Sequence, residues 1–278
     1  MTARESAAGA PAALAHTPQE RDQGRKRGGR GLAARCALGA GGLAVLLALW
    51  WLGTDVLSPE GGMARRFSPG ATFASLGELL TGSELPAHIL VSLRRIAVGL
   101  AFALAIGVPL GLAIGSYRRL EAAVSPAMQF LRMISPLSWM PIAVMVFGVG
   151  DDPVYFLLTF AAVWPIVLNT AAGVQQLDPR WLLLAQSVAA TRWETLRSVI
   201  LPGVLGHILT GVRLAIGILW IVLVPCEMLG VSAGMGYFIL DTRDRLAYSE
   251  LMAMVLLIGV LGFLLDAMAR ALYRYWRG

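Results

Sequence analysis

The sequence predicts an all-α, polytopic membrane protein with about six transmembrane helices. Of its 278 residues, 57% are hydrophobic and 14% are charged, whereas soluble domains carry roughly a quarter charged residues. The apolar residues are also collected into blocks that contain no Asp, Glu, Lys or Arg. A helix of roughly 20 such residues crosses a hydrocarbon core of about 30 Å, and the shorter blocks reach that length with flanking residues that can snorkel. The blocks are residues 36–54, 96–115, 133–150, 153–174, 214–226 and 251–265.

Basic residues flank both ends of the chain, in the tail at 1–36 and at Arg270, Arg274 and Arg277. Because basic residues next to spans remain on the cytoplasmic side, both termini are predicted to be cytoplasmic, which six spans allow. This placement accounts for the net charge of +6 without a nucleic-acid partner. The Ala-, Gly- and Arg-rich tail has little to bury, so we expect residues 1–36 to be disordered and 37–278 to form the transmembrane domain.

The second block carries a stripe of small residues at every fourth position. On a helix this spacing forms one smooth face, where another backbone can approach closely. The alternative is that glycine is simply common in membrane helices. The strict register favours a packing face, although it does not identify the partner helix. The stripe consists of Gly99, Ala103, Gly107, Gly111 and Gly115.

Prolines interrupt the third and fourth blocks, at Pro136, Pro141 and Pro165. A proline inside a helix removes a hydrogen bond and kinks the helix. In a membrane, the carbonyls that it frees need protein or water as partners. The sequence therefore predicts that the third span, which also contains Arg132, faces the protein interior or a wet cavity.

A polar connection at 175–206 separates the fourth and fifth spans and carries helix-capping signals. Asp178 and Pro179 are typical of an N-cap and a first helical position. Thr191 and Glu194 have capping-box spacing. Since Pro202 disfavours helical geometry in the residue before it, the connection is predicted to form two short helices, at 179–189 and 192–200, with a bend at 189–190.

Apolar residues recur in steps of three and four along both short helices, which predicts one apolar face. Such a face can lie on the inner leaflet or pack against the protein's own spans. It can also dock into a groove of a separate soluble protein. The residues of this face are Leu182, Ala185, Ala189, Trp193, Leu196 and Ile200.

Residues 183–202 resemble the cytoplasmic signature of ABC-importer permeases, E-A-A-x(3)-G-x(9)-I-x-L-P. With Leu201 and Pro202 aligned, Val199 occupies the Ile position, while Leu183 and Ala189 replace the family's Glu and Gly. The stretches "NTAAGVQQLDPRW", "LTGVRLAIGILWIVLVPCEMLG" and "GYFILDTRDRLAYSELM" extend the resemblance over about 92–270. Together they resemble permeases of the nitrate/sulfonate/taurine group.

The resemblance implies a type I ABC importer permease fold in a bacterial inner membrane. It implies a homodimer, two cytoplasmic ATP-binding subunits and a periplasmic substrate-binding protein. The cargo would be a small anion such as nitrate, an alkyl or aryl sulfonate, or taurine. The chain has no G-x(4)-G-K-[ST] loop to hold ATP, so we expect a transport subunit and not an enzyme. An ion-gradient-driven secondary transporter is the alternative, but it would require mid-span ionisable sites and related halves.

Two groups of residues are candidates for function in such a permease. Coupling to the ATP-binding subunits is expected at Leu184, Ala185, Ser187, Ala189, Thr191, Arg192 and Trp193. A translocation path is expected near Arg132, Pro136, Arg213 and Glu227, although ion pairing or snorkelling would also explain the charged members. Cys36 and Cys226 have no ligand partner at metal-binding spacing, so neither a metal nor another cofactor is predicted.

Overall fold

A computed structural model describes residues 38–59 and 62–277. Every regular element in these residues is helical, which confirms the all-α fold class. Within them, five helices are long and apolar enough to cross a membrane, or six if one bent helix pair counts as a single span. The tail predicted at 1–36 lies outside the described residues. The chain divides into two compact units between Pro69 and Gly70, and each is described by itself.

The first unit contains the predicted first span. Its helix covers Leu38–Val56 and ends in a π-helical turn, η1 (Leu52–Val56). A short 3-10 helix, η2 (Met63–Phe67), follows. The indole N–H of Trp50 donates to the carbonyl of Phe67 over 2.9 Å, so this bond ties the end of the long helix to the segment after it.

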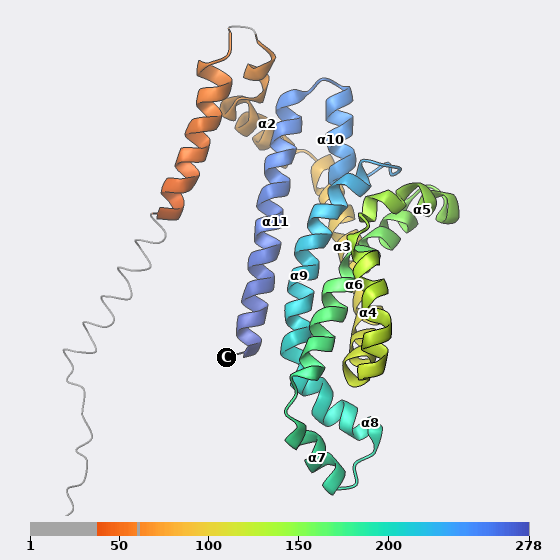
Figure 1. Cartoon of the computed structure of the whole chain (residues 1–278). Coiled ribbons are helices and arrows are strands. Elements are labelled where there is room, and N and C mark those ends of the chain that lie inside the picture. The colour runs from red at the N-terminus through yellow and green to blue at the C-terminus, as the bar shows by residue number, and fades with distance from the viewer. Residues whose placement is uncertain (1–37, 60–61, 278) are drawn as a thin grey trace, which may run out of the picture. The chain divides into compact units, whose positions relative to one another are not determined.

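Three helices form the centre of the second unit: α3 (Glu84–Ser116), α6 (Asp151–Gln175) and α9 (Leu201–Glu227). They run side by side in Figure 1 and bury a common apolar core that includes Leu158, Ile166 and Leu219. Helices α10 (Met235–Asp244) and α11 (Tyr248–Arg277) pack along α9. A further helix, α2 (Pro69–Thr81), precedes α3 in the chain, between the first two apolar blocks of the sequence.

The stripe of small residues on α3 lies against α6. A methyl group added at Gly111 would stand 2.6 Å from the Cβ of Thr170 and 2.8 Å from the carbonyl oxygen of Val167. Equally close contacts occur along the stripe, where Gly99 faces Leu158 and Gly107 faces Ile166. The two backbones therefore approach closely over several turns, which only small residues permit.

The third span differs from the prediction because it is broken. Helix α4 (Arg118–Met133) ends before Pro136, and a bend of 86° separates it from the segment Pro136–Phe147. That segment consists of a 3-10 turn, η3 (Pro136–Trp139), and α5 (Met140–Phe147). Ser135 has an extended backbone, as expected for the residue before a proline. Pro136 thus begins a new helix instead of kinking a continuous one.

The 175–206 connection forms α7 (Pro179–Ser187) and α8 (Arg192–Thr195), with the predicted bend between them. The prediction that Pro202 ends the second helix is wrong, because α8 continues through a π-helical turn, η4 (Leu196–Ile200), into α9. In η4 the N–H of Leu201 donates to the carbonyl of Leu196, five residues back. This wider turn relieves the clash that a proline ring makes with the preceding turn of an α-helix.

We predict that Gly111→Ala destabilises the second unit. The added methyl group would overlap Thr170, and overpacking of this kind costs about 1–3 kcal/mol. Gly217→Ala on α9 is the matched control, because a methyl group there would meet nothing within 4 Å. Unfolding in mild detergent should show a lower free energy of unfolding for Gly111→Ala and no loss for the control. Equal losses at the two positions would contradict close packing of the stripe.

Candidate functional site

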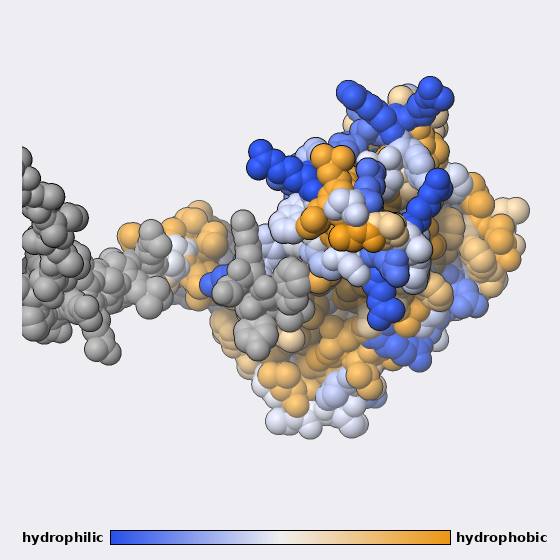
Figure 2. All heavy atoms as spheres, turned by 90° about the horizontal axis from the view of Figure 1, so that it is seen from below, coloured by the Kyte–Doolittle hydropathy of each residue, from blue (hydrophilic) through white to orange (hydrophobic). Residues whose placement is uncertain are grey.

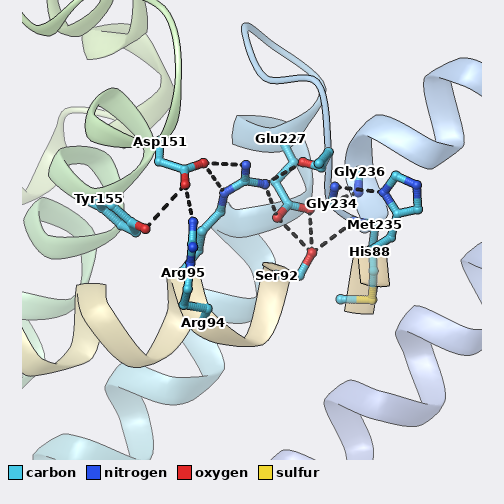
Figure 3. Close-up of polar contacts among 11 residues, drawn as sticks. His88, Ser92, Arg94, Arg95, Asp151, Tyr155, Glu227, Gly234, Met235 and Gly236 are labelled. Carbon is cyan, nitrogen blue, oxygen red and sulfur yellow. Dashed lines mark hydrogen bonds and ion pairs between the residues drawn. The ribbon is translucent and has the colours of Figure 1, made fainter. Parts of the chain in front are cut away.

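A buried ionic cluster joins the three central helices at the end opposite α7 and α8 (Figure 3). The guanidinium of Arg95 on α3 lies 2.7 Å from Glu227 at the end of α9 and 2.5 Å from Asp151 at the start of α6. The side chains of Arg95 and Glu227 are 3% and 0% exposed. Arg95 also donates to the carbonyl of Ala233 over 2.6 Å. A charge at this depth is stable only when it is paired and hydrogen-bonded, and here both partners are.

The cluster also holds the loop that enters α10. Glu227 accepts hydrogen bonds from the hydroxyl of Ser92 (2.7 Å) and from the backbone N–H of Gly236 (2.9 Å). Ser92 in turn accepts from the N–H of Met235. Gly234 has a φ of 119°, and a Cβ there would lie 2.5 Å from both Arg95 and Glu227. Only glycine therefore lets the loop pass over the ion pair.

Two of the four predicted path residues, Arg132 and Pro136, line a cavity. It has a volume of about 450 Å³ and lies between the end of α4, η3, α6 and α9. The other two have ion partners: Glu227 belongs to the buried cluster, and Arg213 on α9 lies 3.8 Å from Asp266 on α11. For these two, ion pairing accounts for a charge within a span.

Helices α7 and α8 project beyond the spans at the other end of the unit (Figure 1). Both predicted caps are present. The side chain of Asp178 accepts from the N–H of Arg180 (2.9 Å), and Thr191 and Glu194 form a reciprocal capping box. These bonds satisfy backbone donors that would otherwise be left free at each helix start. The two short helices are therefore well defined, although they lie outside the packed core.

The bend between α7 and α8 is a Schellman motif with alanine at the position that usually holds glycine. The N–H of Ala190 donates to the carbonyl of Ala185, and that of Ala189 donates to Gln186. Ala189 has a φ of 50°, in the left-handed region. Leu246 (φ 59°) occupies the equivalent position after α10. Ala189 aligns with the glycine of the permease signature, so the structure gives a backbone reason for glycine there.

The predicted apolar face of α7 and α8 is divided between two environments. Ala185 is buried, and Leu182, Leu196 and Ile200 line a groove against the end of α3. The expected role of Ala185 in coupling stays a prediction, with its side chain enclosed between the short helices and the rest of the unit. Arg192 and Trp193 line the same groove but are exposed, Trp193 by 68%, and the other exposed candidates are Leu184, Ser187, Ala189 and Thr191.

Apolar side chains also stand exposed on the surface of α7 and α8. We call this set the α7–α8 apolar surface. Figure 2, which looks onto this end of the molecule, shows apolar groups interleaved with charged ones. The set consists of Trp181 (57% exposed), Leu183 (63%), Leu184 (54%), Val188 (69%) and Trp193 (68%).

Sequence reasoning missed the ionic cluster apart from Glu227. Its charged members, Arg95, Asp151 and Glu227, lie 56 and 132 residues apart, so local spacing gives no sign of their contact. Their positions in the sequence could have indicated the contact. Each of the three residues stands next to an apolar block, and all three are at the same predicted side of the membrane. In the described residues, no group of three or more His, Cys, Asp or Glu could hold a metal ion.

Comparisons with known proteins identify relatives across most of the chain. Residues 107–278 match the family described as "Binding-protein-dependent transport system inner membrane component". The bicarbonate transport system permease protein CmpB of Synechococcus elongatus is 38% identical over 188 residues, 67% of each chain. The taurine transport system permease protein TauC of Escherichia coli is 32% identical over 260 residues, 89% of this chain and 92% of that protein.

A solved structure has the same fold. It is a bacterial alginate ABC transporter in complex with an alginate pentasaccharide-bound periplasmic protein. The matched chain superposes with a TM-score of 0.61 at 14% identity, over 88% of this chain and 96% of that one. The predicted type I importer permease fold is therefore confirmed.

We predict that Arg95→Met lowers the free energy of unfolding by about 3–5 kcal/mol, because it leaves Glu227 buried without a counter-charge. Arg94→Met is the control: Arg94 also contacts Asp151, but its side chain is 57% exposed, and loss of an exposed pair costs at most about 1 kcal/mol. Adding Glu227→Met to Arg95→Met should recover part of the loss, since no unpaired buried charge remains. Detergent unfolding of the wild type and the three variants measures this, and equal losses for the two arginines would contradict it.

We also predict that Ala189→Gly stabilises the bend. Holding a non-glycine residue in the left-handed region costs about 1–2 kcal/mol, and glycine removes this cost. Glycine also gains freedom in the unfolded chain, which lowers the benefit by about 0.5–1 kcal/mol. The expected gain is about 0.5–1 kcal/mol in the free energy of unfolding. Ala190→Gly is the control and should give no gain, because the backbone of Ala190 is not left-handed. A loss of stability in Ala189→Gly would show that the φ of Ala189 is not strained.

Proposed function

The chain belongs to the family of binding-protein-dependent transport system inner membrane components, and on that premise we propose that it is the permease subunit of an ATP-driven importer of a small oxyanion. Its relatives are named transport permease proteins, and the sequence contains no phosphate-binding loop of its own. The energy for uphill transport would therefore come from separate ATP-binding subunits.

The α7–α8 apolar surface carries the proposal. Exposed tryptophan and leucine side chains on a capped two-helix unit are typical of a helix that docks into a groove of another protein. Arg192 and Arg197 stand among them and can pair with acidic groups at the rim of such a groove. We assign this surface to the ATP-binding subunit, with Leu184 and Trp193 as its apolar anchors.

The helix that follows this surface provides the mechanical link. The stretch Arg192–Glu227 is one helix of 36 residues, about 54 Å long at 1.5 Å per residue. It begins beside Trp193, passes the cavity next to Arg132 and ends at Glu227 in the ionic cluster. A displacement of α8 by a closing ATPase would therefore reach both the cavity and the far end of the membrane.

The remaining partners follow from the same assignment. Two copies of the chain would pair in the membrane, each binding one ATP-binding subunit on the cytoplasmic side, where the basic termini are also expected to lie. A periplasmic binding protein would deliver the cargo to the opposite end. The named relatives transport bicarbonate and taurine, which supports an oxyanion such as nitrate, a sulfonate, taurine or bicarbonate.

We predict that Leu184→Asp separates the permease from its ATP-binding subunit. A carboxylate at the centre of an apolar contact typically costs more than 2 kcal/mol, so we expect at least a roughly 10-fold loss of co-purified ATPase. ATP-dependent uptake of radiolabelled taurine, nitrate or bicarbonate into proteoliposomes should fall in parallel. Both the amount of bound ATPase and the uptake rate are measured on the purified complex.

Leu246→Asp is the matched control, because Leu246 is similarly exposed (61%) but lies in the turn after α10. It should retain the ATPase. Equal retention in both variants would contradict the docking assignment. Uptake that continues without ATP and stops with a protonophore would instead support the ion-gradient alternative.

A further inference from the structure

The break in the third span lies beside a cavity at the middle of α6. Ile134 and Ser135, between α4 and η3, have extended backbones. Non-helical backbone at such a depth is tolerated only where it is buried in protein or lines a cavity. Ile134 and Pro136 both line the cavity of about 450 Å³, and α6 contributes residues from its middle, Phe160 to Asn169.

Arg132 brings a positive charge to this cavity without a counter-ion. It lies in the last turn of α4, about 21 Å along the helix from Arg118 at 1.5 Å per residue. Arg95 and Arg213, also within spans, each have a carboxylate partner. In the described part of the chain, no carboxylate lies within ion-pair distance of Arg132. Its side chain is exposed in this structure, so it can face water in the cavity and can pair there with an anion from outside the chain.

A second donor without a partner lines the same cavity. The indole N–H of Trp164 on α6 is buried and has no acceptor in the described structure. A buried N–H without a hydrogen bond costs about 1–3 kcal/mol, so an acceptor supplied by a ligand would be favoured. The indole nitrogen has no exposed surface in this structure, so the ring must turn before an anion held at Arg132 can also accept from it.

The rest of the lining is apolar and large. Phe160, Leu168, Leu214, Ile218 and Val222 contribute most of the wall. Ligand sites of about 300–1,000 Å³ with mainly apolar walls and a few polar groups suit molecules that have an apolar body. A bare inorganic ion such as nitrate would lose its hydration without filling this wall.

We propose that this cavity is a binding site of the permease itself, selective for an organic oxyanion such as a sulfonate. The anionic head lies at Arg132 and Trp164, and the hydrocarbon or aromatic body lies against Phe160, Ile218 and Val222. The inference rests on the proposed function and deepens it, because it places a selectivity step inside the membrane, after delivery by the binding protein.

Direct binding to the purified permease in lipid nanodiscs tests this site without ATP or a binding protein. Benzenesulfonate, nitrate and neutral benzyl alcohol serve as probes, followed by calorimetry. Benzenesulfonate should bind at least about 10-fold more tightly than the other two. Arg132→Gln should weaken benzenesulfonate binding about 10- to 100-fold, as expected for loss of a charged hydrogen-bonding partner. Arg132→Lys should retain part of the affinity, since it keeps the charge but not the fork of donors.

Two further variants keep the result interpretable. Arg213→Gln is the matched control and should bind like the wild type, because Asp266 keeps Arg270 as a partner. Ile218→Trp fills the cavity while leaving Arg132 in place, so it should weaken benzenesulfonate more than methanesulfonate. The elution volume in size-exclusion chromatography identifies any variant that has not folded.

The outcomes separate this inference from the proposed function. Equal affinity for benzenesulfonate and nitrate, or no effect of Arg132→Gln in a folded protein, overturns the organic-oxyanion site. Equal binding of benzyl alcohol and benzenesulfonate also overturns it, because the cavity is then only an apolar crevice. Selective benzenesulfonate binding supports the site even if ATP-driven uptake fails, and ATP-driven uptake without such binding supports the importer alone.

Discussion

The structure depends on one constraint: in hydrocarbon, every backbone polar group and every charge needs a partner within the protein. Helices satisfy this constraint for the backbone, and the ionic cluster satisfies it for the buried charges of Arg95 and Glu227 and for the half-buried Asp151. The exceptions are therefore informative. The extended backbone at Ser135, the charge of Arg132 and the indole N–H of Trp164 all occur around one cavity. Other buried side-chain groups without a partner in the described residues, on Thr72, Trp139 and Thr170, lie outside the lining of this cavity.

The two ends of the molecule are connected by a single element. The helix Arg192–Glu227 begins in the two-helix unit and ends in the ionic cluster, and its middle forms one wall of the cavity. The π-helical turn η4 allows this continuity, because it accommodates Pro202 without breaking the helix. The second short helix predicted from the sequence is thus the beginning of one long helix. Under the proposed function, this continuity would let a partner bound at the α7–α8 apolar surface displace residues beside the cavity.

Much of the fold could be predicted from local sequence signals, whereas the contacts between distant segments could not. Uncharged blocks identified the spans, and the caps at Asp178 and Thr191 identified α7 and α8. Local rules failed at prolines: Pro136 begins a helix after a break, and Pro202 lies within a continuous one. The outcome at a proline depends on the neighbouring turn, which local propensity does not determine. Among the expected path residues, Arg132 could be singled out from the sequence because a charge within a span is costly. The pairing of Glu227 with Arg95 could be seen only in the folded chain, because the two residues are far apart in the sequence.

The glycine contacts between α3 and α6 determine which parts of the unit can move. Sliding α3 along α6 by one residue would bring Val108 or Leu112 to positions that accept only glycine, so every turn would collide at once. These two helices therefore behave as a rigid body. Changes of shape in the unit must occur around this frame, at extended joints such as Ile134–Ser135. Helices α3 and α6 pack backbone to backbone, so no layer of side chains between them can rearrange. Motion is therefore left to the joint at Ile134–Ser135, which lies beside the cavity.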